Sequence, residues 1–230
     1  MSASFFKRLT SSIVDFVLIF LVVYFAFVVG GRTLLRNRVD NFDEIYSAYN
    51  EILVAYNSNL TDLQTEYDAN LELANEDAEL EALALTEFNQ KSNILNQQNN
   101  IDIEPYNEPL TSYYLEIIYF FTVGFIVLMT IVTIAFIGRT PGRKLMKVQL
   151  ASDVGNGELK RPNPIQVFFH DIILKYFFIV LIFAMSMYYG LIFILVSLII
   201  DMVLISVTKN KSTIRDYLLR LRVVKAGNGY

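Results

Sequence analysis

The chain has 230 residues, of which 54% are hydrophobic and only 18% are charged, and its mean hydropathy is +0.41. This composition is too apolar for an ordinary soluble domain and is typical of a membrane protein. The absence of Cys excludes disulfides and thiolate metal sites, and the single His leaves little for an imidazole metal site. Since no catalytic pair or cofactor motif stands out, we expect no enzyme, no metal and no cofactor. The net charge of −4 argues against a nucleic-acid partner.

The first apolar run, Ser12 to Gly31, is long enough to cross a bilayer and contains one ionisable residue, Asp15. Lys7 and Arg8 precede it, as they would in a signal peptide. However, the run exceeds the roughly 15 apolar residues of such a peptide, and no cleavage site follows. Residues 1–31 therefore predict a short cytoplasmic stub and a first transmembrane helix.

Residues 32–112 carry sixteen acidic and four basic residues, with no Gly or Pro between Arg32 and Glu104. A continuous helix is therefore permitted. One apolar stripe with alternating spacings of three and four residues consists of Tyr46, Tyr49, Leu53, Tyr56, Leu60, Leu63 and Tyr67. A weaker second stripe consists of Leu71, Ala74, Ala78, Leu85, Phe88 and Leu95. The two stripes could pair as an antiparallel, coiled-coil-like hairpin, or the segment could pack against other copies. Residues 91–107 are rich in Asn and end with Pro105 and the nearby Pro109, which indicates a loop returning to the membrane.

Residues 113–138 predict the second transmembrane helix. The apolar region 165–208 is about twice as long as one span, and Tyr188-Tyr189-Gly190 lies near its middle, so we expect two helices joined by a tight turn. In an alternative with three spans, Ile165 to Lys175 would form an amphipathic helix in the membrane interface.

The basic residues indicate the orientation. Segment 139–164 contains six basic and two acidic residues, and the tail 209–230 contains six and one, whereas 32–112 is acidic. Since cytoplasmic loops collect Lys and Arg, four spans with both termini in the cytoplasm of a cell membrane fit best, although Arg32, Arg36 and Arg38 slightly oppose the rule. The expected fold is all-α and polytopic, with 32–112 as an extracytoplasmic helical insertion. The residues expected at lipid headgroups are Arg139, Arg143, Lys144 and Lys147.

Charged residues in a transmembrane helix are costly and need a reason. Arg8 and Asp15 lie two turns apart on one helix face. In the four-span topology, Asp201, His170 and Asp171 reach a depth similar to that of Asp15. These groups could bind a cation or relay a proton, or they could simply pair with nearby Arg8, Lys175 or Arg139.

Two further motifs lie on the cytoplasmic side. Gly138-Arg-Thr-Pro-Gly142-Arg-Lys lacks the spacing of a phosphate-binding loop and instead predicts a tight turn at the membrane exit, and Asn156-Gly157 predicts a second, hairpin-like turn. The tail contains Thr213-Ile-Arg-Asp216 and ends in Arg222-Val-Val.

Together these features resemble the RDD family of membrane proteins. An Arg before the first span, an Asp within it, a G-x-T-x-G-[KR]-[KR] stretch and a T-x-x-D…R-V-V ending carry the resemblance, which covers about 150 residues outside the insertion. Arg8 and Asp15 match the family's Arg and first Asp, and Asp216 matches the second better than Asp201. The chain departs from many members by having Arg215 in place of His, Leu221 in place of Thr, and Gln166 and His170 in place of Arg.

The resemblance implies a transport role, sometimes taken to be exchange of monovalent cations for protons. We therefore expect a transporter of a small cation or solute, with Asp15 and Asp201 as ligands and Arg8 as their electrostatic partner. Four spans would need an oligomer, such as a dimer, to enclose a path. The alternative is a membrane-anchored scaffold whose outer segment binds a protein partner. The lack of Trp and the Asn-rich stretches suit an AT-rich bacterial genome.

Overall fold

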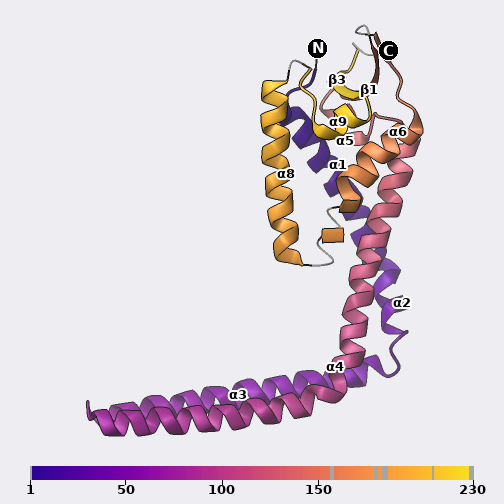
Figure 1. The fold of residues 1–230 in the computed structure, drawn as a ribbon. Coiled ribbons are helices and arrows are strands. Elements are labelled where there is room, and N and C mark those ends of the chain that lie inside the picture. The colour runs from indigo at the N-terminus through magenta and orange to yellow at the C-terminus, as the bar shows by residue number, and fades with distance from the viewer. Residues whose placement is uncertain (1, 156–157, 179–180, 183–185, 209, 228–230) are drawn as a thin grey trace. The chain divides into compact units, whose positions relative to one another are not determined.

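The computed structural model describes residues 2–155, 158–178, 181–182, 186–208 and 210–227 (Figure 1). The elements are α1 Phe5–Ala26, η1 Phe27–Gly31, α2 Arg32–Arg36, α3 Phe42–Ala74, α4 Ala78–Phe136, α5 Pro141–Leu145, β1 Val148–Gly155, β2 Glu158–Lys160, α6 Pro164–Phe168, η2 Phe169–Phe177, α8 Met187–Val207, α9 Ile214–Leu218 and β3 Leu221–Lys225, where η denotes a π-helix. The chain divides into two compact units, Met1–Val29 with Tyr119–Tyr230, and Gly30–Ile118. Helix dominates as expected, but the expected all-α class omits a three-stranded sheet.

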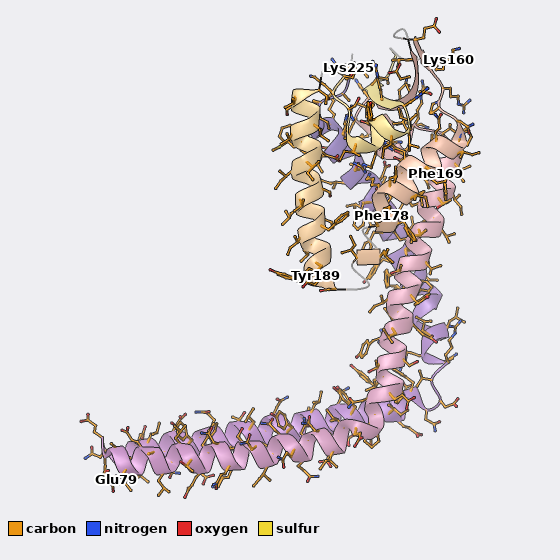
Figure 2. The ribbon with its side chains drawn as sticks, viewed as in Figure 1. Glu79, Lys160, Phe169, Phe178, Tyr189 and Lys225 are labelled. Atoms are coloured by element: carbon orange, nitrogen blue, oxygen red, sulfur yellow. The ribbon has the colours of Figure 1, made fainter. Side chains whose placement is uncertain are left out.

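Three of the described helical stretches are long and apolar enough to cross a membrane: Phe5–Arg36, Ala78–Phe136 and Tyr188–Val207. The α1 residues that are buried include Arg8, Ser11 and Asp15, whereas Phe25 on the same helix is 68% exposed. Figure 2 shows apolar side chains projecting outwards from these helices. An exterior of this kind is stable where the surroundings are themselves apolar, so the chain is compatible with a membrane protein.

The region expected to hold the third and fourth spans has its break earlier than predicted. Asn163 caps α6 through a capping box with Gln166, and α6 continues directly into η2. The second helix, α8, starts at Met187 after Ser186, whose backbone is extended. Tyr188, Tyr189 and Gly190 therefore lie in the first turns of α8, so the predicted turn at these residues is wrong. An isolated Gly is tolerated inside a helix, and here Gly190 donates its N–H to Ser186.

In the unit Gly30–Ile118, α3 and the first part of α4 run antiparallel. Phe42 packs on Tyr113 with ring centroids 4.5 Å apart, and Tyr67 packs on Phe88 at 4.9 Å. Tyr56 donates to Asn96 between these two pairs. In these three contacts, a residue that lies later in α3 meets a residue that lies correspondingly earlier in α4, which is the register of an antiparallel helical hairpin. The stripe that begins at Tyr46 therefore faces the second helix of the hairpin, and every member except Tyr46 is partly buried.

The Asn-rich segment 91–107, predicted to be a loop, is helical throughout. Helix α4 continues for 59 residues through Pro105 and Pro109. Each proline removes one backbone hydrogen bond and strains one turn, but neither is accompanied by a Gly that would help to end the helix. The buried Leu110 and Tyr113 follow directly and hold the helix in place by packing. Packing therefore outweighs the local signal to stop.

The sheet has the order β2-β1-β3 and is antiparallel, with Val148 opposite Lys225 and Ser152 opposite both Leu221 and Lys160. Ser2 forms a bridge to Val224, and the N–H of Ala3 donates to the carbonyl of Val223 at 2.8 Å. A buried apolar cluster beneath the sheet consists of Ala3, Val148, Leu150, Val167, Leu221 and Val223. Backbone pairing at the sheet thus joins residues near the N-terminus to residues near the C-terminus. The predicted turn at Asn156-Gly157 lies outside the described residues.

Candidate functional site: a buried charge cluster

The short helix α9 places Asp216 under the sheet. Thr213 caps α9 by accepting the N–H of Asp216, and the Asp216 carboxylate accepts the N–H of Thr213 in return. This T-x-x-D capping box satisfies backbone groups that would otherwise be buried without partners. It leaves the remaining Asp216 lone pairs facing α1 and η2, and only 1% of the residue surface is exposed.

Arg8 of α1 reaches this carboxylate. Its Nη1 donates to Asp216 Oδ2 at 2.5 Å, and its Nη2 donates to the carbonyl of Lys211 at 2.6 Å. The pair is buried, with side chains 10% and 1% exposed. Because 208 residues separate the two, this ion pair joins the first helix to the tail. It adds to the sheet pairing of the same two chain ends.

His170 connects Asp216 to a second carboxylate. Its Nε2 lies 2.8 Å from Asp216 Oδ1, and its Nδ1 lies 2.7 Å from Asp171 Oδ1. Asp171 also receives two hydrogen bonds from Arg143, at 2.6 and 2.7 Å, in the bidentate geometry that suits a guanidinium. His170 and Asp171 lie on η2, and π-helical turns are frequent at functional sites.

The number of protons that Asp171, His170 and Asp216 hold together follows from the chemistry of these three groups. An ionised carboxylate only accepts hydrogen bonds, and a neutral imidazole has one donor nitrogen. Both contacts of His170 can be hydrogen bonds only if the imidazole is doubly protonated or if one carboxyl group holds the proton. The chain Asp171–His170–Asp216 therefore holds one proton more than a neutral imidazole and two carboxylates would.

Asp15 contacts the beginning of α5. Its Oδ2 accepts the hydroxyl of Thr140 at 2.5 Å, and its Oδ1 accepts the N–H of Gly142 at 2.7 Å. These donors lie at the beginning of α5, so Asp15 caps that helix from α1. A Cβ added to Gly142 would lie 2.1 Å from the carbonyl oxygen of Ser11, so the contact requires glycine. Thr140 and Gly142 of the G-x-T-x-G stretch thus fit α5 against α1, whereas Gly138 lies against Leu150 and Pro162.

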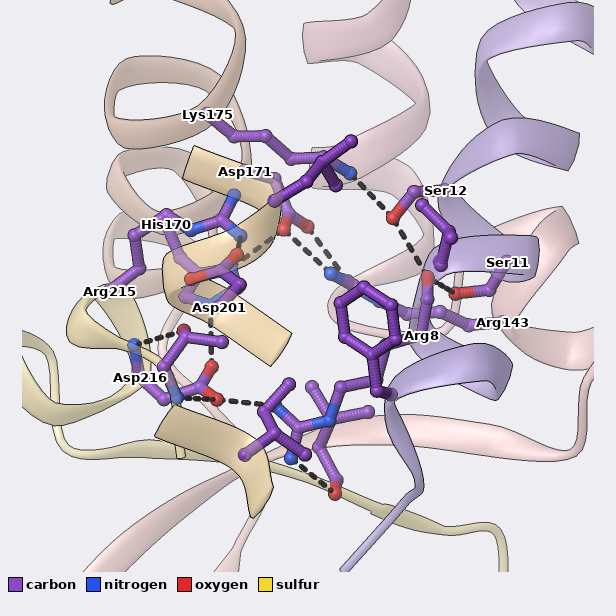
Figure 3. Close-up of a pocket in the computed structure, with 16 residues that line it drawn as sticks. Arg8, Ser11, Ser12, Arg143, His170, Asp171, Lys175, Asp201, Arg215 and Asp216 are labelled. Atoms are coloured by element: carbon purple, nitrogen blue, oxygen red, sulfur yellow. Dashed lines mark hydrogen bonds and ion pairs between the residues drawn. The ribbon is translucent and has the colours of Figure 1, made fainter. Parts of the chain in front are cut away.

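The charged groups surround a cavity of about 110 Å³ (Figure 3). Asp201 on α8 lines it and accepts a hydrogen bond from Arg215 of α9 at 2.5 Å. Lys175 of η2 also lines it and donates to Ser12 Oγ at 2.8 Å. The charged and titratable residues that line the cavity are Arg8, Arg143, Lys175, Arg215, Asp171, Asp201, Asp216 and His170.

The structure thus brings the six residues predicted from the sequence into one region. Arg8, Asp216, His170 and Asp171 form a continuous chain, Asp201 lies across the same cavity, and Asp15 lies beside it at α5. Among the described residues, no group of three or more acidic, His or Cys side chains could hold a metal ion.

The residues expected at lipid headgroups separate into two kinds. Lys144 and Lys147 are exposed, and Lys144 lies over the ring of Phe136. Arg143 instead is 7% exposed and holds Asp171, which places it in the cluster rather than at a headgroup. Arg139 is partly buried.

Sequence reasoning missed the roles of several partners. It placed Arg143 among the headgroup residues, named Lys175 only as an ion-pair partner and gave Arg215 no role. The usable signal for Arg143 was its position in the G-x-T-x-G-[KR]-[KR] stretch, next to the glycine that Asp15 requires. Thr213 could have been found as a helix cap from the T-x-x-D spacing.

Electrostatics keep Asp216 ionised. Burial opposes ionisation, but the hydrogen bond and charge of His170, the charge of Arg8 and the N–H of Thr213 together outweigh it, so the pKa of Asp216 lies well below its usual range. Similarly, burial lowers the pKa of Arg143, but its contacts with Asp171 outweigh that effect and leave it raised.

We expect acid to weaken the fold through Asp216. The unfolded chain, with an ordinary Asp pKa of 3.8, takes up a proton before the folded protein does. The contribution of Asp216 to the free energy of unfolding is therefore present above pH 3.8 and is lost as the pH falls towards the lower folded value. Chemical unfolding in detergent between about pH 6 and about pH 3 should show this fall. Asp216→Asn should show a shallower fall, and an equal or steeper one would contradict this assignment.

Comparisons of the chain with protein-family models, with curated proteins and with solved structures found no match.

Proposed function

We propose that the chain is a membrane transport protein of the RDD type that takes up and releases a proton in the Asp171–His170–Asp216 chain while it moves a small ion or solute. The observation that carries the proposal is the doubly bridged His170, 5% exposed, beside a cavity that charged side chains line. A buried titratable chain of this kind, next to helices apolar enough to span a bilayer, is costly and is commonly functional.

The pairing of the two chain ends supports the four-span topology. Ala3 pairs with Val223, so both ends belong on one side of the membrane and the number of crossings between them must be even. The helices α1, α4 and α8 supply three crossings. The apolar segment 164–186 is the remaining stretch that could supply the fourth. The basic residues in 139–164 and in the tail favour the cytoplasm of a cell membrane for this side.

The test is proton movement in vesicles that contain the purified full chain and a pH-sensitive dye. An imposed gradient of Na⁺, K⁺ or Cl⁻ should drive a change in internal pH that empty vesicles lack. We expect His170→Gln to reduce the rate at least tenfold, because Gln keeps a hydrogen-bond donor for one carboxylate but cannot exchange a proton. Lys160→Gln, which removes an exposed charge on β2, is the matched control and should behave as the unmodified protein.

Two outcomes would count against the proposal. One is the absence of any flux above that of empty vesicles from protein shown to be folded. The other is an undiminished rate in His170→Gln, which would remove the proton role from this chain of residues.

A second candidate function is a membrane-anchored scaffold that acts through the helical hairpin of α3 and α4. The observation that favours it is the exposure of apolar side chains on the hairpin, such as Val54 at 69% and Ile94 at 66%. Deletion of residues 41–100 should abolish partner binding by a scaffold and should leave transport intact. A deletion variant that is folded but lacks flux would contradict this division of roles.

A further inference from the structure

The cavity beside His170 is lined by more positive than negative groups. Its basic side chains are Arg8, Arg143, Lys175 and Arg215, and its carboxylates are Asp171, Asp201 and Asp216. Each carboxylate accepts hydrogen bonds from one arginine. The three ion pairs therefore balance, and the charge of Lys175 remains in excess, together with the additional proton of the Asp171–His170–Asp216 chain.

Lys175 is also incompletely satisfied by its neighbours. Its ammonium group has three N–H donors, and one of them is directed at Ser12 Oγ. The group also lies 4.6 Å from the centroid of the Tyr176 ring, which is neutral and leaves the charge unbalanced. Among the described side chains, no carboxylate lies within ion-pair distance of Lys175. Ser12 cannot neutralise the charge, because its hydroxyl, which donates to the carbonyl of Arg8 at 3.0 Å, is uncharged.

The same arrangement disfavours a bare cation as the occupant. A cation would need carboxylate or carbonyl oxygens, yet the carboxylates here are engaged by guanidinium groups, which it would have to displace. Four basic side chains would repel it in surroundings that screen charge poorly. A small anion, in contrast, would balance Lys175 and find unused N–H donors on it.

We infer that the cavity binds a small monovalent inorganic anion, of the size of chloride, against the ammonium group of Lys175. This rests on the proposed transport function and names the class of its substrate or co-substrate. A volume of about 110 Å³ accommodates a few water-sized groups, so a halide with one or two waters fits, whereas a sugar acid does not. The donors available to the anion are the remaining N–H groups of Lys175.

The test is equilibrium binding to the full chain in a non-ionic detergent that carries no phosphate. Chloride replaces gluconate at constant Na⁺ and ionic strength while the midpoint of thermal unfolding is followed. An anion that binds the folded state raises this midpoint saturably. We expect a saturable rise for the unmodified protein, at least a tenfold weaker effect in Lys175→Gln and a preserved effect in Lys175→Arg. Lys160→Gln is the control for loss of one positive charge and should keep the rise.

Several results would overturn the inference. They are the absence of a saturable chloride effect in the unmodified protein, an equal effect in Lys175→Gln, and stabilisation by added anionic lipid but not by chloride, which would assign the ammonium group to a lipid phosphate. The readout is independent of proton flux. Flux without chloride binding would leave the proposed transport function standing, and chloride binding without flux would leave this site standing.

Discussion

Asp171→Asn should be among the most destabilising single substitutions in the chain, lowering the free energy of unfolding by about 3 to 5 kcal/mol. The carboxylate receives both guanidinium nitrogens of Arg143 and one nitrogen of His170, and the residue is 1% exposed. An amide in its place offers one acceptor oxygen and carries no charge. The buried Arg143 would then lack a counter-charge within its hydrogen-bonding reach.

The measurement is reversible unfolding in mixed micelles, with Asp153→Asn as the matched control. Asp153 also pairs with an arginine, Arg222, but both side chains are more than a fifth exposed. Water screens such a pair, so its loss should cost about 1 kcal/mol or less. Equal losses of unfolding free energy in the two variants would mean that burial does not determine how strongly these ion pairs stabilise the fold.

The sequence was sufficient to predict the acidic residues and the histidine of the cluster, because the cost of burying a charge is a local property. A charge among apolar residues must find a partner, so Asp15, His170, Asp171 and Asp201 could be singled out one at a time. Their actual partners could not be assigned in this way. Arg8 meets Asp216 across 208 residues, and such a pairing follows only from how the tail folds back.

The sheet was missed for a related reason. Residues 148–155 occur in a basic segment, and the strand that completes their burial, β3, lies about 70 residues further along the chain. Four consecutive buried residues begin β1, so the alternation that marks a half-exposed strand is absent there. Arg143 was assigned to the headgroups for the same reason. A basic residue in a loop beside a span normally contacts headgroups, and its partner Asp171 lies in a different segment of the sequence.

The helical hairpin shows where a local signal misled. The stripe from Tyr46 to Tyr67 predicted α3, and the hairpin was one of the two arrangements it allowed. The Asn-rich stretch and its two prolines then indicated a loop, but α4 passes through them. Propensity is a weak guide where a continuous apolar face, here Ile103, Tyr106 and Leu110, is buried on a neighbour.

Gly142→Ala should damage the cluster through the backbone rather than through charge. The new Cβ would lie 2.1 Å from the carbonyl oxygen of Ser11 and 3.0 Å from the carboxyl group of Asp15, so α5 would have to move away from α1. That movement would lengthen both hydrogen bonds to Asp15 and draw Arg143 away from Asp171. We expect a loss of roughly 3 kcal/mol or more in the free energy of unfolding.

Gly30→Ala is the matched control, because Gly30 is also helical and a Cβ there meets nothing within 4 Å. It should be neutral or stabilising, by roughly 0.5 to 1 kcal/mol. Both variants add one methyl group to a helical glycine, so their difference measures the close approach of α5 to α1. If Gly142→Ala were as stable as Gly30→Ala, Asp15 would not be holding α5 by the geometry described. The function of Asp15 would then have to be sought in ion binding, as the sequence first indicated.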